Sequence, residues 1–194
     1  AIIDAIDPKK DVDGFHPYNL GCLAAGKPIF IPCTPKGIMR IFQHYNITIS
    51  GKHVVVVGRS NIVGRPISIL TSLKQANSNG TTTICHSGTD NIIHYTKQAD
   101  IIILAMGSLG YLKGDHIKEA AIVIVVGINL VTDNSPKEYK LVGDGDKPPP
   151  LEKVSVITLV PGAVGPITIA TAPYTHFRAH ETLRYPLSRF LCKK

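Results

Sequence analysis

The chain has 194 residues, 44% of them hydrophobic and 18% charged, and this composition excludes an intrinsically disordered chain. Its length allows one domain or one domain with added elements. A membrane-spanning helix needs about 20 apolar residues, and the apolar runs of this chain are far shorter. The formal net charge of +7 favours an anionic partner, but no run of Lys and Arg exceeds two residues, so an arm that binds nucleic acid is not expected.

The first 30 residues contain turn signals and little apolar periodicity, so we predict a connecting segment there. A helix is predicted next, over residues 37–45. Thr34 can cap the free N–H groups at its start, and Pro35 suits the first helical position.

Short β-branched runs then alternate with helix-like segments. The predicted strands are residues 54–57, 81–85, 101–105 and 122–126, and the predicted helices are residues 63–73, 91–98 and 115–120. Strands without polar alternation are buried on both faces, as in a parallel sheet covered by helices. The predicted fold is therefore α/β, with a doubly wound parallel sheet.

Residues 144–194 are predicted to contain a loop, a strand and a helix. The loop covers residues 144–150 (DGDKPPP), and the strand covers residues 154–159. The helix starts near Pro166, and Pro173 is expected to kink or break it.

The four cysteines are Cys22, Cys33, Cys85 and Cys192, and no two of them form a C-x-x-C pair. We therefore expect neither a disulfide framework nor a metal site, and the default location is a reducing cytoplasm or organelle matrix. The first residues do not have the pattern of a signal peptide.

A glycine-containing turn follows the first predicted strand and opens a helix. Gly58 allows a tight turn, and Gly64 allows the helix to pack close to the strand. In this position a turn can place backbone N–H groups against a pyrophosphate. The spacing is not G-x-G-x-x-G, so an ordinary strand-to-helix turn remains the alternative.

The residues at the end of the second predicted strand distinguish between NAD and NADP as the expected cofactor. Enzymes that bind NAD often have an acid there, about 20 residues after the turn, to hold the ribose 2′-OH. This chain has Cys85-His86-Ser87 instead, and Arg59 and Arg65 lie in or beside the turn. These residues suit a 2′-phosphate and favour NADP, while His86 taken alone is more typical of a structural histidine.

Short motifs occur along almost the whole chain, at residues 10–17 (KDVDGFHP), 32–37 (PCTPKG), 56–60 and 62–64 (VVGRS, IVG), 85–87 (CHS), 99–101 (ADI), 126–129 (VGIN), 142–144 (VGD), 160–162 (VPG) and 164–166 (VGP). In these motifs and in their order, the chain resembles the bifunctional methylenetetrahydrofolate dehydrogenase/methenyltetrahydrofolate cyclohydrolase family.

The resemblance implies a Rossmann-like fold and NADP-dependent oxidation of 5,10-methylenetetrahydrofolate to the methenyl form. Hydrolysis to 10-formyltetrahydrofolate follows in the same cleft. By resemblance, Gly58, Arg59 and Ser60 hold the cofactor phosphates, Ser87 joins Arg59 at the 2′-phosphate, and Ile128 lies near the nicotinamide.

The resemblance also implies the folate contacts. Asp13 binds the pterin, because a carboxylate can accept two hydrogen bonds from its amidine-like edge. The pocket is lined by a segment that comprises Leu159, Val160, Pro161, Gly162 and Ala163. From the residues alone, a turn residue ahead of Gly14 is the favoured interpretation of Asp13, and the octapeptide match reverses this preference. Without the resemblance, the segment is equally a plain strand-to-helix turn.

The chain departs from the family at five positions. Val125 stands where the family usually has Asp, Gly145 and Lys147 replace Val and an aromatic residue, Leu159 replaces Pro, and Ala163 replaces Gly. A methyl group at Ala163 is expected to crowd the pocket or to disfavour a positive-φ conformation. The turn at residues 58–64 and Ser87 are unchanged, so cofactor binding is better supported than catalysis.

The family's N-terminal domain, with its Tyr-x-x-x-Lys pair, has no counterpart in these residues. No catalytic residue is therefore assigned in this chain, and we expect the chain alone to bind NADP weakly and to show neither activity. The predicted division is a connection over residues 1–30, an NADP-binding domain over 31–165 and a helical segment over 166–194 that packs on the missing domain.

The expected partners are a tetrahydrofolate derivative and, by resemblance, a second copy of the chain in a homodimer. The expected compartment is the cytoplasm, or the mitochondrial matrix if a transit peptide is missing. One alternative is a non-catalytic, degenerate NADP-binding or interaction module. Nucleic-acid binding through the positive charge is a second alternative, but no motif or aromatic platform supports it.

Overall fold

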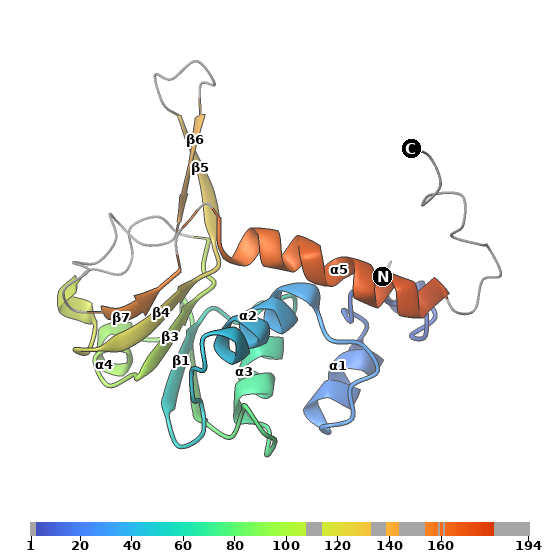
Figure 1. Ribbon diagram of the computed structural model, residues 1–194, viewed down its shortest axis with the longest axis horizontal. Helices are drawn as coiled ribbons and strands as arrows, with labels where there is room; N and C mark the ends of the chain where they lie inside the picture. Colours follow the sequence, from blue (N-terminus) through green and yellow to red (C-terminus); the bar gives the residue numbers. More distant parts are fainter. Residues whose placement is uncertain are drawn as a thin grey trace.

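The fold is built on a sheet of five parallel strands in the order β2-β1-β3-β4-β7 (Figure 1). The computed structural model describes residues 3–107, 114–132, 139–143, 154–158, 160 and 162–180. The strands of the sheet are β1 (His53–Val57), β2 (Thr81–Cys85), β3 (Ile101–Leu104), β4 (Ala121–Val125) and β7 (Val154–Ile157). The predicted parallel α/β sheet is confirmed.

Helices cover both faces of the sheet. The helices are α1 (Pro17–Ala24), α2 (Cys33–His44), α3 (Gly64–Ser72), α4 (Ile92–Thr96) and α5 (Val164–His180), with 3₁₀ turns at Ile3–Ala5 and Gly114–His116. Helix α1 packs against α3, and α5 packs against α2. In Figure 1, α2 and α3 lie on one side of the sheet and α4 lies on the other. The doubly wound arrangement follows from this placement.

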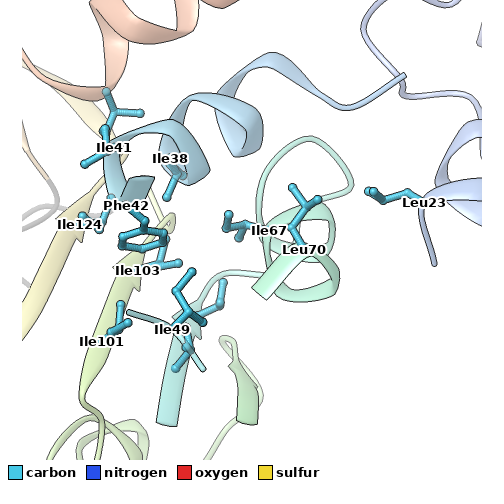
Figure 2. Close-up of a cluster of buried hydrophobic side chains, with 13 residues drawn as sticks. Leu23, Ile38, Ile41, Phe42, Ile49, Ile67, Leu70, Ile101, Ile103 and Ile124 are labelled. Atoms are coloured by element: carbon cyan, nitrogen blue, oxygen red, sulfur yellow. The ribbon is translucent and has the colours of Figure 1, made fainter. Parts of the chain in front are cut away.

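Two apolar cores result because successive side chains of a strand point to opposite faces. Val54 and Val56 of β1 face the first core, where Ile38 and Phe42 of α2 and Ile67 of α3 pack against them (Figure 2). The second core lies on the opposite face. It contains Val55 and Val57 of β1 with Ile102, Leu104, Ile92 and Ile117. The central strands are therefore buried on both sides, as their apolar sequences predict.

A two-stranded antiparallel ribbon projects from this sheet and was not predicted. It pairs β5 (Ile128–Thr132) with β6 (Tyr139–Gly143), and Figure 1 shows it standing away from the five-stranded sheet. From the sequence, Ile128 is expected only as a neighbour of the nicotinamide. The predicted loop at 144–150, with Gly145 and Lys147, lies outside the described residues.

Helix boundaries differ from the predictions in three places. The prediction that Thr34 caps α2 is wrong, because the helix begins at Cys33 and Pro32 is the N-cap residue, without a side-chain bond. Helix α1 was missed; its signals are Pro17 at the first position and the ring of His16, which accepts a bond from the N–H of Tyr18. Helix α5 continues past Pro173 without the expected break.

The length of one short helix was overestimated from the sequence. The helix predicted at residues 115–120 is a single 3₁₀ turn at Gly114–His116. Among the described residues, none of the helices is long and apolar enough to cross a membrane.

Candidate functional site

The candidate cofactor site lies at the carboxyl ends of the parallel strands. β1 has β2 on one side and β3 on the other, so the chain reverses its direction of winding at β1. In open α/β sheets, ligands bind in the crevice beyond the strand ends at such a switch point. The loop that leaves β1 contains the predicted residues Gly58, Arg59 and Ser60.

Backbone crowding in this loop requires glycine at two positions. Gly58 has a φ of +134°, and a Cβ there would lie 2.3 Å from the carbonyl oxygen of Ala105, after β3. A Cβ on Gly64 would lie 2.3 Å from the carbonyl oxygen of Gly58. The first turn of α3 is thus held directly against the β1 turn. This is the close approach that a dinucleotide-binding turn requires, so the residues present fit the expected cofactor.

Ser60 closes the amino end of α3. Its Oγ accepts hydrogen bonds from the N–H groups of Val63, at 3.1 Å, and Gly64, at 3.3 Å. Its carbonyl oxygen also accepts a bond from the N–H of Arg65, at 2.9 Å. These bonds leave the hydroxyl proton of Ser60 available to an anion. Ser60 is therefore exposed to solvent directly at the positive, amino-terminal end of α3.

Ser87 lies beside this loop. Val57 and Cys85 are aligned in the pairing of β1 with β2, and the N–H of Gly58 donates to the carbonyl oxygen of Cys85 at 2.8 Å. The loops that follow the two strands therefore leave the sheet side by side. Arg59 and Ser87 are both exposed there. The predicted phosphate-binding residues thus share one edge of the sheet.

His86 and Cys85 have structural surroundings. The His86 ring Nδ1 accepts a bond from the N–H of Gly88, and the backbone N–H of His86 donates to the hydroxyl of Thr89. These bonds shape the turn that presents Ser87. Burial raises the pKa of the Cys85 thiol, so this thiol is kept in its neutral form.

The other predicted residues near the sheet also follow strand ends. Ile128 begins β5, and two residues separate it from Val125 at the end of β4. Val160, Gly162 and Ala163 come after β7, which is paired with β4, whereas Leu159 and Pro161 lie outside the described residues. The chain therefore brings these segments to the same carboxyl edge.

Ala163 does not have the positive φ that was considered for it. The residue with a positive φ is the preceding Gly162, at +126°, and Ala163 is not among the residues with a positive φ. The methyl group of Ala163 therefore causes no strain of this kind.

Asp13 lies elsewhere, beside the beginning of α2. It is exposed in the turn before Gly14, whose φ is +68°. A Cβ on Gly14 would lie 3.2 Å from the side chain of Pro32, just before α2. Helix α5 reaches the same end of α2, where the hydroxyl of Thr171 donates to the carbonyl oxygen of Cys33 at 3.2 Å. α2 thus links the Asp13 turn with the helix that follows Ala163.

Two polar residues were missed in the sequence. Asp11 is buried and accepts three hydrogen bonds through its carboxylate. Thr158 is buried at the end of β7, and its hydroxyl oxygen accepts a bond from the N–H of Val125 at 2.7 Å. The sequence contains no signal for Thr158. For Asp11, the only signal is its place in the octapeptide that also contains Asp13.

Val125 occupies an apolar environment. Its side chain is 5% exposed and belongs to the second core. The departure from the family's Asp therefore puts an apolar side chain where the surroundings are apolar. Among the described residues, no group of three His, Cys, Asp or Glu side chains is placed to hold a metal ion.

Comparison with known proteins identifies relatives of the chain. The profile described as "Tetrahydrofolate dehydrogenase/cyclohydrolase, NAD(P)-binding domain" matches residues 32–182. A curated relative, the "Bifunctional protein FolD" of Chlorobium chlorochromatii, is 54% identical over 169 residues, which are 86% of this chain and 57% of the relative.

Solved structures give the same result. The bifunctional FolD enzyme of Campylobacter jejuni has a TM-score of 0.81 and 42% identity, covering 94% of this chain and 62% of that one. The enzyme of Trypanosoma brucei, complexed with NADP and an inhibitor, has a TM-score of 0.83 and 34% identity, with coverage of 94% and 62%. The chain thus spans 57% to 62% of the length of these three proteins.

Proposed function

Because the chain belongs to the tetrahydrofolate dehydrogenase/cyclohydrolase family, we propose that it forms the NADP-binding part of a bifunctional enzyme. The enzyme oxidises 5,10-methylenetetrahydrofolate to 5,10-methenyltetrahydrofolate and hydrolyses this product to 10-formyltetrahydrofolate. NADP, when bound, accepts the hydride. Both reactions belong to the whole enzyme, whereas the residues of this chain are assigned to the binding of NADP and folate.

The turn between β1 and α3 carries this proposal. Gly58 and Gly64 remove the side chains that would otherwise block the approach of the two backbones. Arg59 contributes a positive charge at the mouth of the turn, and Ser60 contributes a hydroxyl proton at the amino end of α3. A pyrophosphate is the group that such a turn binds best.

The 2′-phosphate of NADP is assigned to Arg59 and Ser87. Both side chains are exposed on neighbouring loops, and no acidic residue follows β2 directly. A guanidinium with a hydroxyl binds a phosphate, while an acid would repel it and favour the free ribose hydroxyl of NAD. Ile128 is assigned to the nicotinamide end because it follows β4, which is separated from β2 by β1 and β3.

The folate is assigned to two parts of the chain. Asp13 binds the pterin edge from the helical side, and the segment from Leu159 to Ala163 lines the pocket from the end of β7. The exposed carboxylate of Asp13 and the placement of Val160, Gly162 and Ala163 after β7 support this assignment. No acid or base for the hydrolysis is assigned here, so the 194-residue chain alone is expected to turn over neither substrate.

We also propose the predicted division at residues 30 and 165, a homodimer and a cytoplasmic or mitochondrial-matrix location. β2 is an edge strand of the sheet, and Ile84 on it is 40% exposed, which suits pairing with a second copy. Cys22 and Cys85 are free thiols, which suits a reducing compartment.

The experiment that tests this function is calorimetric titration of the 194-residue chain with NADP and with NAD. Each titration is made with and without 5-formyltetrahydrofolate, a stable folate analogue. NADP is expected to bind more tightly than NAD, and the analogue is expected to bind only when Asp13 is intact. Equal affinity for NADP and NAD would contradict the cofactor assignment, and analogue binding by Asp13→Asn at wild-type affinity would contradict the folate assignment.

A further inference from the structure

The octapeptide at residues 10–17 contains two acids with opposite surroundings. Asp13 is exposed, and no group in the described part of the chain is hydrogen-bonded to its carboxylate. Asp11 is only 6% exposed, and both of its carboxylate oxygens are occupied. One acid is therefore free to bind a ligand, and the other is committed to the fold.

The bonds of Asp11 enclose the turn that contains Asp13. Oδ1 accepts from the N–H of Phe15 at 3.2 Å, and Oδ2 accepts from the N–H of His16 at 2.8 Å. The carbonyl oxygen of Asp11 accepts from the N–H of Gly14 at 3.1 Å. Each of these bonds joins Asp11 to a residue that follows Asp13 in the sequence, so together they hold the backbone of the turn that contains Asp13.

A simple helix-capping role does not account for these bonds. Helix α1 begins at Pro17, and its cap is His16, whose ring accepts a bond from Tyr18 at 3.0 Å. The N–H groups that Asp11 binds belong to Phe15 and His16, which precede the helix. Asp11 therefore fixes the turn, while His16 caps the helix.

Asn19 holds Asp11 in place at a cost. Its amide Nδ2 donates to Oδ2 of Asp11, at 2.7 Å, and to the carbonyl oxygen of Pro8, at 2.8 Å. Its Oδ1 is buried without a partner in the described part of the chain, which destabilises the folded state. The two donors of one amide explain why an asparagine suits this position, since an apolar residue would leave both acceptors without this donor.

We infer that Asp11 is a positioning residue, which holds the turn at residues 12–14 so that the carboxylate of Asp13 faces the folate. The identity of the ligand rests on the proposed function, whereas the control of the turn by Asp11 does not. Asp11 itself contacts no ligand, because both of its carboxylate oxygens are bonded to its own chain.

The test compares Asp11→Asn with two matched variants, Asp13→Asn and Asp100→Asn, in the 194-residue chain. In Asp11→Asn, the new amide group would place a donor against at least one N–H or amide donor. We expect faster hydrogen exchange at Phe15 and His16 and shifted NMR signals for Asp13 and Gly14. Affinity for 5-formyltetrahydrofolate is expected to fall about tenfold, as for one lost charged hydrogen bond, with NADP affinity unchanged.

The two controls separate positioning from general stability. Asp13→Asn is expected to weaken analogue binding but to leave the exchange at Phe15 and His16 unchanged. Asp100→Asn removes a carboxylate that also accepts a backbone N–H, at the opposite end of the sheet. It is expected to lower the melting temperature without a change in the turn signals or in analogue affinity.

Each outcome decides the inference. Wild-type exchange and affinity in Asp11→Asn would overturn it, and so would equal losses of NADP and analogue affinity, which indicate general destabilisation. If the wild-type chain binds no analogue, the folate part of the proposed function fails, and the exchange and NMR shifts alone decide whether Asp11 holds the turn. If Asp11→Asn does not fold, Asp11→Glu keeps the charge but moves both carboxylate oxygens away from the N–H groups of Phe15 and His16. Wild-type exchange at both residues and wild-type analogue affinity in that variant would overturn the inference.

Discussion

The two ends of the parallel sheet use polar residues in different ways. At the amino end, Asp100 accepts bonds from the N–H of His53 and from Nζ of Lys118, at 3.0 and 2.7 Å. Its backbone also bonds to His53 in β1 and to Ile122 in β4, so one residue joins three strands. At the carboxyl end, Arg59 and Ser87 are exposed on loops shaped by glycine and backbone contacts.

This difference shows where binding can occur in the sheet. Polar groups that satisfy one another stabilise the fold, but they have little capacity left for a ligand. The carboxyl end is shaped by close backbone approach, and its exposed side chains keep their donors available. Substitutions at the amino end should therefore change stability without changing NADP affinity, whereas substitutions at the carboxyl end should change NADP affinity.

The largest effect is expected for Gly58→Ala. A Cβ there would lie 2.3 Å from a backbone oxygen at a φ of +134°, so the β1 turn and the Ala105 segment must move apart. We expect a loss of roughly 3 kcal/mol or more of folding free energy, together with loss of NADP binding. Urea denaturation and calorimetric titration measure the two effects.

Gly51→Ala is the matched control for that substitution. Gly51 also has a positive φ, +72°, but nothing lies within 4 Å of the position that a Cβ would take there. Only the backbone strain of about 1 kcal/mol is expected, with NADP binding retained. Similar losses in the two variants would show that steric crowding at the turn is unimportant.

Ser60→Ala is expected to have the next largest effect. It removes the acceptor for the N–H groups of Val63 and Gly64 and the hydroxyl proton assigned to the pyrophosphate. Loss of the acceptor for two backbone N–H groups costs about 1 to 2 kcal/mol. Both stability and NADP affinity should therefore fall. Unchanged NADP affinity in a destabilised variant would restrict Ser60 to the helix.

Asp100→Asn should affect stability alone. The side chain of Asp100 is 27% exposed and that of Lys118 is 48% exposed, so solvent weakens their attraction. We expect a loss of about 1 kcal/mol of folding free energy with NADP affinity unchanged. A clear decrease in NADP affinity would contradict the separation of the two ends.

The smallest expected effect is the pH dependence of the folding free energy that Asp100→Asn loses. The hydrogen bonds from Lys118 and from the backbone of His53 lower the pKa of Asp100 below its ordinary value. The group is thus stabilising above its unfolded-state pKa of about 4, and this contribution disappears as the pH falls through the lower folded-state pKa. Melting temperatures of wild type and Asp100→Asn should converge below about pH 4; a constant difference would contradict this linkage.

The sequence predicted the parts of the fold that depend on local apolar pattern. The central strands β1, β3 and β4 were located because their apolar β-branched runs are buried on both faces. The edge strand β2 was located from its β-branched run alone, since its residues are only partly buried. Helix α1 was missed because Asp13-Gly14 and His16-Pro17 read as turns, although the second pair marks the start of a helix. The β5–β6 ribbon was missed because pairing between residues 128–132 and 139–143 is not visible in their composition.

The candidate site was only partly predictable for the same reason. The glycine turn and its neighbours could be found from their place after a buried strand. The different roles of Asp11 and Asp13 could not, because two acids in one motif differ only in burial and bonding. Thr158 forms its bond with Val125 across 33 positions of sequence, and no local pattern indicates such a contact.

We propose that the carboxyl end of the sheet binds NADP through Arg59 and its neighbours. The most direct measurement is the affinity of Arg59→Ala for NADP and for NAD, with Arg40→Ala, an exposed arginine on α2, as the matched control. We expect NADP affinity to fall about tenfold or more in Arg59→Ala, with NAD affinity changed far less and Arg40→Ala like wild type. Equal NADP affinities in wild type and Arg59→Ala would contradict the account.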